Sequence, residues 1–78
     1  MYLKMRDTKI TKETAITTLF YSVFLISRFT EKQFINYCLK NWTDIKDEMD
    51  LLEYSRLLEE VIEEKEKIRE DIYAYYKK

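Results

Sequence analysis

The sequence predicts an all-α protein, and three observations lead to this prediction. The 78 residues include neither glycine nor proline, so the two strongest helix breakers are absent. Three threonines, Thr11, Thr30 and Thr43, precede stretches with helical spacing, where a threonine side chain can cap a helix. The last third of the chain repeats apolar residues every seven positions. We therefore expect two shorter helices and a long C-terminal amphipathic helix, assembled as a dimeric helical bundle or coiled coil.

The length predicts a single helical domain over residues 1–78, divided into three segments by charge. Residues 1–10 alternate weakly between apolar and basic side chains, which suits either a flexible arm or a short strand. Residues 11–43 carry a net charge of +4 and are predicted to be a basic helical hairpin, with helices over about 12–28 and 31–41. Residues 44–78 carry a net charge of −5 and are predicted to be one acidic helix over about 44–76, either straight or bent near Asp50, where Asp50 and Glu53 have the spacing of a looser capping box.

The two shorter helices differ in how much of their surface is apolar. Thr30 and Gln33 have the spacing of a reciprocal capping box, which places a helix start at residue 31. That second helix has one apolar face, whereas the first is apolar around much of its circumference and needs neighbours on more than one side. Its uncharged stretch, residues 14–27, is shorter than the ~20 apolar residues that span a bilayer, so we expect a buried helix.

The long helix carries the heptad pattern. Eight positions form the predicted dimer seam: Leu51, Tyr54, Leu58, Val61, Lys65, Ile68, Ile72 and Tyr75. Lys65 interrupts the seam, where it either specifies register or extends its stem across apolar surface to reach a carboxylate. The outer positions of the long helix are acidic. Together with one tyrosine they form a predicted surface for a basic protein partner: Glu59, Glu63, Glu66, Glu70 and Tyr73.

Several classes of function are excluded by residue types that the chain lacks. Without glycine there is no phosphate-binding loop, and without histidine there is neither the commonest general base nor most metal sites. The single cysteine, Cys38, lies among apolar residues, where a thiol is inert. We expect no enzymatic activity and neither a cofactor nor a metal site. One unpaired cysteine and a charged N-terminus without a signal peptide indicate a cytoplasmic protein.

The preferred function is that of a small interaction or regulatory protein, a homodimer that binds another macromolecule through its helices. The alternative is a small DNA-binding regulator, whose contacts would come from the basic half: Lys4, Arg6, Lys9, Lys32, Gln33, Asn36 and Lys40. Residues 30–42 resemble the second helix of a ribbon-helix-helix repressor, with a capping hydroxyl, an apolar pair, a small residue and a further apolar residue. This resemblance implies base reading by a strand at Lys4 and Arg6, or at Lys9 and Thr11. In this alternative the acidic C-terminal helix would dimerise or bind an effector, a layout similar to that of a proteic antitoxin. Abundant lysine, isoleucine and tyrosine suit an AT-rich genome such as that of a phage or plasmid.

Overall fold

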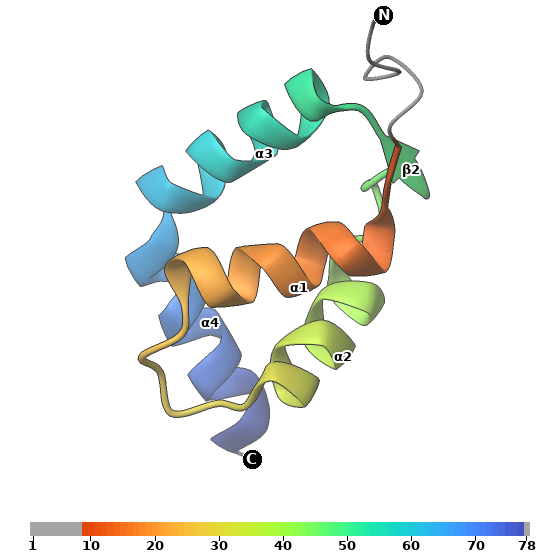
Figure 1. Ribbon diagram of the computed structural model, residues 1–78. Helices are drawn as coiled ribbons and strands as arrows, with labels where there is room; N and C mark the ends of the chain where they lie inside the picture. Colours follow the sequence, from red (N-terminus) through yellow and green to blue (C-terminus); the bar gives the residue numbers. More distant parts are fainter. Residues whose placement is uncertain (1–8, 78) are drawn as a thin grey trace, which may run out of the picture.

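The computed structural model describes residues 9–77, which form mainly helices together with a very small sheet. In chain order the elements are β1 (Ile10–Thr11), α1 (Lys12–Val23), α2 (Glu31–Asn41), β2 (Glu48–Met49), α3 (Leu51–Glu63) and α4 (Lys65–Lys77) (Figure 1). The prediction of a mainly helical protein is confirmed, and the helix predicted over 31–41 has the bounds of α2. Lys4 and Arg6 lie outside the described residues.

Side-chain caps begin three of the helices. Thr11 caps α1 by accepting a hydrogen bond from the Thr14 backbone N–H at 3.2 Å. Thr30 forms the predicted capping box, in which its hydroxyl accepts from the Gln33 N–H at 3.1 Å and its own N–H donates to Gln33 Oε1 at 2.9 Å. The prediction for Thr43 is wrong, since this residue lies in a turn and the next helix is capped by Asp50.

Helix α1 ends at Val23, five residues before the predicted boundary at residue 28. Apolar residues continue past that point in a non-helical connection over 24–30, where Phe24 and Phe29 turn inward while Leu25 and Ile26 stay exposed. Phe24 and Phe29 are both buried, with ring centroids 5.9 Å apart. On a continuous helix, residues five apart point about 140° away from each other. The connection therefore allows two phenylalanines to enter one core, which a longer helix would prevent.

The prediction of one long C-terminal helix is also wrong, because the segment forms two helices that meet at Glu64. Helix α4 leaves the end of α3 at a sharp angle and packs beside α2 (Figure 1). The Tyr76 hydroxyl donates to the Gln33 carbonyl at 2.8 Å, so the end of α4 is hydrogen-bonded to the start of α2. A straight rod would carry Ile72, which is fully buried, about 16 Å along the axis beyond the buried Val61. Bending brings both residues into one core within a single chain, and no coiled coil is present in the described residues.

The core is built around four phenylalanines, Phe20, Phe24, Phe29 and Phe34. Phe34 is fully buried, and its ring centroid lies 5.1 Å from that of Phe24 and 6.0 Å from that of Phe29. Further buried residues come from every helix: Ile16, Leu19, Cys38, Val61 and Ile72. No polar or charged residue among those described is buried.

The two strands connect the beginning of the described chain to its middle. They pair antiparallel, with Ile10 opposite Met49 and Thr11 opposite Glu48. The Lys12 N–H extends the pairing by donating to the Asp47 carbonyl at 2.8 Å. Helices α1 and α3 therefore start from the same small sheet and extend in similar directions (Figure 1).

Candidate functional site

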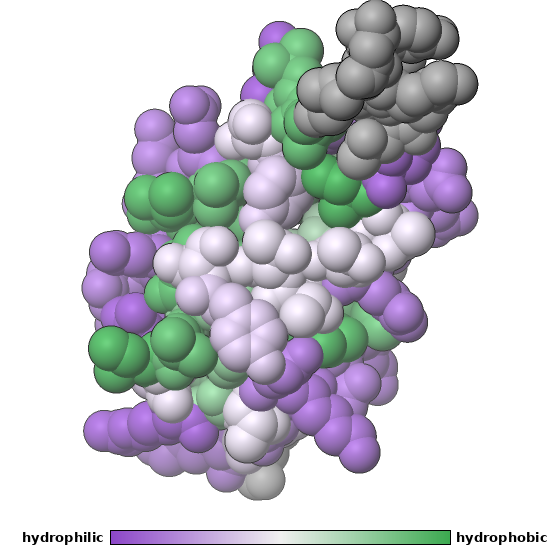
Figure 2. Space-filling view, in the orientation of Figure 1, coloured by the Kyte–Doolittle hydropathy of each residue, from purple (hydrophilic) through white to green (hydrophobic). Residues whose placement is uncertain are grey.

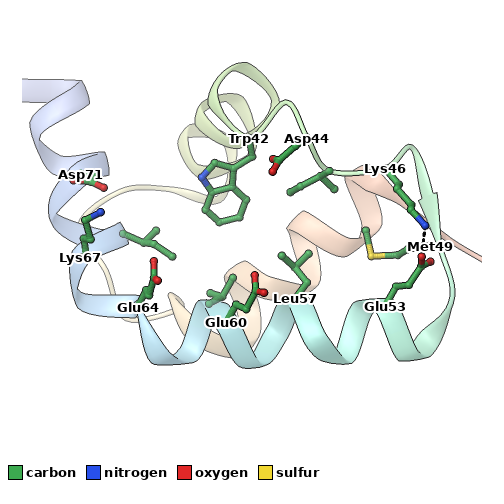
Figure 3. A pocket seen from close by; sticks show the side chains of 13 residues that line it. Trp42, Asp44, Lys46, Met49, Glu53, Leu57, Glu60, Glu64, Lys67 and Asp71 are labelled. Carbon is green, nitrogen blue, oxygen red and sulfur yellow. Dashed lines mark hydrogen bonds and ion pairs between the residues drawn. The ribbon is translucent and has the colours of Figure 1, made fainter.

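A groove of about 480 Å³ runs along one side of α3 and is the candidate functional site. Its walls come from the connection between α2 and β2, from α3, and from the first half of α4. Trp42 and Asp44 lie across the groove from Leu57 and Glu60 of α3 (Figure 3). The apolar part of the lining consists of Trp42, Ile45, Met49, Leu57, Val61 and Ile68.

The Trp42 side chain joins this groove to the core. It follows the last residue of α2, and its backbone N–H donates to the Cys38 carbonyl at 2.8 Å. The indole packs edge-on against Phe34, with centroids 5.9 Å apart and an interplanar angle of 86°. One part of the indole thus packs against the core while another lines the groove.

The charged part of the lining is mostly acidic. Five carboxylates line the groove, Asp44, Glu53, Glu60, Glu64 and Asp71, against two amines, Lys46 and Lys67, so the lining has a net charge of −3. Lys46 Nζ forms an ion pair with Glu53 Oε2 at one end (Figure 3). Because this pair neutralises itself, the excess negative charge lies with Asp44, Glu60, Glu64 and Asp71, of which Lys67 offsets part.

The Lys46–Glu53 pair also changes the acidity of both groups. The hydrogen bond from Lys46 lowers the pKa of the Glu53 carboxyl, and the backbone N–H of Asp50 lowers it further. The same bond raises the pKa of Lys46. Glu53 is also the partner of Asp50 in the capping box of α3. Its Oε1 accepts from the Asp50 N–H and its Oε2 from Lys46 Nζ, so the carboxylate connects the start of α3 to the preceding loop.

The predicted dimer seam is largely packed inside the chain. Val61 and Ile72 are buried, and Tyr54, Leu58 and Ile68 pack partly buried against the same core. Tyr75 is half-buried with its ring 5.1 Å from that of Tyr37, whereas Leu51 and Lys65 are exposed. The heptad pattern in this chain therefore reflects burial within one protomer, and dimerisation through it stays a prediction.

The acidic surface predicted for a partner lies outside the groove. Glu59, Glu63, Glu66 and Glu70 are exposed, and Glu66 forms an ion pair with Arg69 at 2.9 Å. None of these four lines the groove.

Tyr73 is the fifth member of that predicted surface, and it joins α4 to the segment 24–30 between α1 and α2. It is half-buried, and its hydroxyl accepts from the Arg28 N–H at 3.2 Å. Its ring centroid lies 5.5 Å from that of Phe29 and 5.6 Å from the Arg28 guanidinium carbon. The structure thus gives Tyr73 a role in packing.

Sequence reasoning missed the carboxylates that do line the groove. A signal was present, because Glu53, Leu57, Glu60 and Glu64 recur at spacings of three and four and therefore share one face of α3. Asp44 and Asp71 reach the same groove from other segments, and nothing in their local sequence indicates this.

The predicted nucleic-acid contacts lie on another part of the molecule. Lys32, Asn36 and Lys40 are exposed and spaced four residues apart, so they form a row on α2. Gln33 is half-buried and engaged in the Thr30 capping box, and Lys9 is exposed at the start of the described chain.

Other chemical features of the described residues are few. Cys38 is buried, and desolvation raises the pKa of its thiol well above the ordinary value. Within residues 9–77 no group of three or more potential ligands is arranged to hold a metal ion. No helix in this part of the chain is long and apolar enough to cross a bilayer.

Comparisons with known proteins do not assign the chain to a family. No protein-family model matches it, and no curated protein or solved structure is significantly similar to it.

Proposed function

We propose that the protein is a non-enzymatic, cytoplasmic binding protein whose groove holds a basic, amphipathic segment of another protein. The observation that carries this proposal is an apolar groove lining accompanied by unneutralised carboxylates. Apolar side chains of the bound segment would lie on Trp42, Leu57 and Val61, while its lysines and arginines would face Glu60, Glu64 and the acidic residues opposite.

The dimensions of the groove suit a short helix. Glu53 and Glu64 mark the two ends of its α3 wall, which at 1.5 Å per residue is about 16 Å long. Three turns of helix cover that length and present apolar residues at i, i+3 or i+4, and i+7. The carboxylates would chiefly accelerate association, since charges at the rim of an interface steer the encounter more than they hold the complex.

A synthetic peptide tests the proposal directly. The probe is a fluorescein-labelled 14-residue helix with leucine at i, i+3 and i+7 and lysine at its polar positions; a matched peptide carries glutamate at those positions. We expect saturable binding of the lysine peptide and quenching or a shift of the emission of Trp42, which is the only tryptophan. Absence of binding at low salt, or equal binding of both peptides, would refute the proposal.

Charge-neutralising variants locate the site on the protein. The groove variant combines Glu60→Gln, Glu64→Gln and Asp71→Asn. At about 0.5 kcal/mol for each partly exposed charge, it should weaken binding of the lysine peptide about tenfold at low salt. The loss should become smaller as salt increases.

The matched control removes three charges from the outer acidic surface by Glu59→Gln, Glu63→Gln and Glu66→Gln. These residues are exposed and do not line the groove, so binding should change less than twofold at equal net charge. An equal loss of affinity in both triple variants would mean that net charge, and not the groove, attracts the peptide.

The row of Lys32, Asn36 and Lys40 supports DNA binding as a second candidate function. All three side chains are exposed along one side of α2, where they can reach phosphates or base edges. This candidate needs no groove, so the peptide experiment and a DNA-binding experiment distinguish the two functions.

A further inference from the structure

From Thr14 onward the outer face of α1 carries no charged residue, in a chain of which 37% of the residues are charged. The exposed Glu13 lies before it, in the first turn. No Asp, Glu, Lys or Arg occurs between Thr14 and Ser27. Of these residues, Thr14, Thr18, Tyr21 and Ser22 are exposed on the helix. In Figure 2 this face is pale, and hydrophobic groups border it over α3 and over the connection between α1 and α2.

One line of apolar and hydroxyl side chains on α3 continues this face, and the exposed Glu59, four residues from Ser55 and three from Ile62, lies at its border. Leu51, Ser55 and Ile62 are separated by four and seven residues, so they lie along one line of the helix, and all three are exposed. Helices α1 and α3 pack against the same core, to which α1 contributes Ile16 and Leu19 and α3 contributes Val61, with Tyr54 partly buried against it. The residues of α3 that line the groove, such as Glu60 and Glu64, occupy a different side of the helix.

The uncharged face exposes much apolar surface for so small a chain. Ile26 is 92% exposed, Leu25 59%, Tyr21 52%, Leu51 49% and Ile62 47%. These five residues leave roughly 600 Å² accessible, compared with about 800 Å² that each partner buries in a stable interface. The neighbouring hydroxyl-bearing residues supply the remaining area.

The absence of charge points to one kind of occupant, a second copy of the chain. In a twofold dimer each patch meets itself, so a charged residue near the axis faces a like charge. Threonine and serine hydroxyls avoid this conflict because each can both donate and accept a hydrogen bond. The Tyr21 hydroxyl donates to the Glu31 carboxylate of α2 at 2.5 Å, so Glu31 borders the face and the tyrosine contributes its ring to it. We propose that the uncharged face, formed by exposed residues of α1, Leu25, Ile26 and the Leu51–Ser55–Ile62 line of α3, is a homodimer interface.

This interface shares only Leu51 with the heptad seam, and it does not depend on the peptide-binding groove. The buried seam residues Val61 and Ile72 stay in the core of each protomer. The groove lies on a different side of α3, so it remains open in the dimer.

Light scattering coupled to size-exclusion chromatography tests the interface with the full chain and no ligand. The native protein should elute with twice its 9.7 kDa mass at micromolar concentration. Ile26→Lys and Thr18→Lys each put one lysine on the proposed interface of both protomers. The two like charges should repel each other, and the variant should elute as a 9.7 kDa monomer. Both positions are exposed, so circular dichroism should show native helix content and a melting temperature close to that of the native chain measured as a monomer at high dilution.

Leu39→Lys is the matched control, because Leu39 is 37% exposed and lies on α2, which contributes no residue to the proposed interface. This variant should remain dimeric. A native chain that is monomeric over the whole concentration series would overturn the proposal, as would a folded Ile26→Lys or Thr18→Lys variant that stays dimeric. Dissociation of the Leu39→Lys variant would also contradict it. Peptide binding by the monomeric variants is a separate readout, so failure of the groove and failure of the interface are distinguishable.

Discussion

Replacing Phe34 with alanine is expected to remove a large part of the stability of the fold. The side chain is fully buried, and its ring packs against four others, those of Phe20, Phe24, Phe29 and Trp42, at centroid distances of 5.8, 5.1, 6.0 and 5.9 Å. A buried phenylalanine reduced to alanine costs about 3–5 kcal/mol, through lost transfer free energy and the cavity left behind. The total available is about 4–12 kcal/mol for 78 residues at typical stability per residue.

Urea unfolding followed by circular dichroism measures this change. Ellipticity is the better probe, because the fluorescence of Trp42 depends directly on its contact with Phe34. The control is Ile26→Ala, which also shortens an apolar side chain but at a site that is 92% exposed. Its effect should stay within about 0.5 kcal/mol if urea unfolding is compared at a protein concentration where both forms are monomeric.

The difference between the two substitutions tests the described core. If Phe34→Ala lowers the free energy of unfolding by less than about 1.5 kcal/mol, and Ile26→Ala lowers it by the same amount, these rings are not packed as described. A Phe34→Ala variant that is already unfolded in buffer agrees with the upper end of the expected loss of about 3–5 kcal/mol. In that case Phe34→Leu, which fills most of the cavity, should restore a cooperative unfolding transition.

Three further predictions concern charge and capping. If the α2 row binds DNA, Lys32→Glu with Lys40→Glu should abolish gel shifts of genomic fragments at low salt; an unchanged shift would exclude this row as the contact surface. The lowered pKa of Glu53 means that its pairing with Lys46 stabilises the fold above the ordinary glutamate pKa and is lost as pH falls. Glu53→Gln should therefore reduce the fall in melting temperature below about pH 5, and an identical pH profile would contradict this. Asp50→Ala should destabilise the protein by about 1 kcal/mol in thermal unfolding, and no measurable change would show that the cap of α3 is dispensable.

The parts of the fold that could be predicted from sequence are those determined by short-range contacts. Thr30 and Gln33 are three residues apart, and their reciprocal hydrogen bonds need no other part of the chain. The same holds for the Asp50 and Glu53 box, which the sequence also contains and which marks the start of α3 better than Thr43 does. Helix α2 was predicted with its observed bounds because its cap and its single apolar face agree.

The errors arose where distant residues decide the structure. Phe24 ends α1 because it meets Phe34 in the core, and no local signal distinguishes it from a helical residue. The turn at Glu64 contains neither glycine nor proline, and it forms because α4 packs against α2 and the 24–30 connection through Tyr76 and Tyr73. A seven-residue repeat cannot show whether its apolar side chains are covered by a second chain or by the same one.

The candidate site was only partly predictable for the same reason. An acidic surface on the C-terminal half was expected, but its members Glu59 and Glu63 lie outside the groove. The groove depends on Trp42, which the sequence places on the apolar side of α2 without showing that part of its indole lines a cavity. Its position follows from the return of the chain from α2 to β2, which is a property of the tertiary structure.

The pairing of β1 with β2 has a consequence for the order of events in folding. Joining Thr11 to Glu48 closes a loop of 36 residues, and closure of a loop of that length costs about 3 kcal/mol of chain entropy. The few hydrogen bonds of this pairing, the Lys12–Asp47 bond among them, contribute about 1 kcal/mol each, so on their own they hardly offset the entropy of closing the loop. We therefore expect the strands to pair after α1 has docked on α2 and α3, so that substitutions at Ile10 or Met49 accelerate unfolding and leave the folding rate almost unchanged.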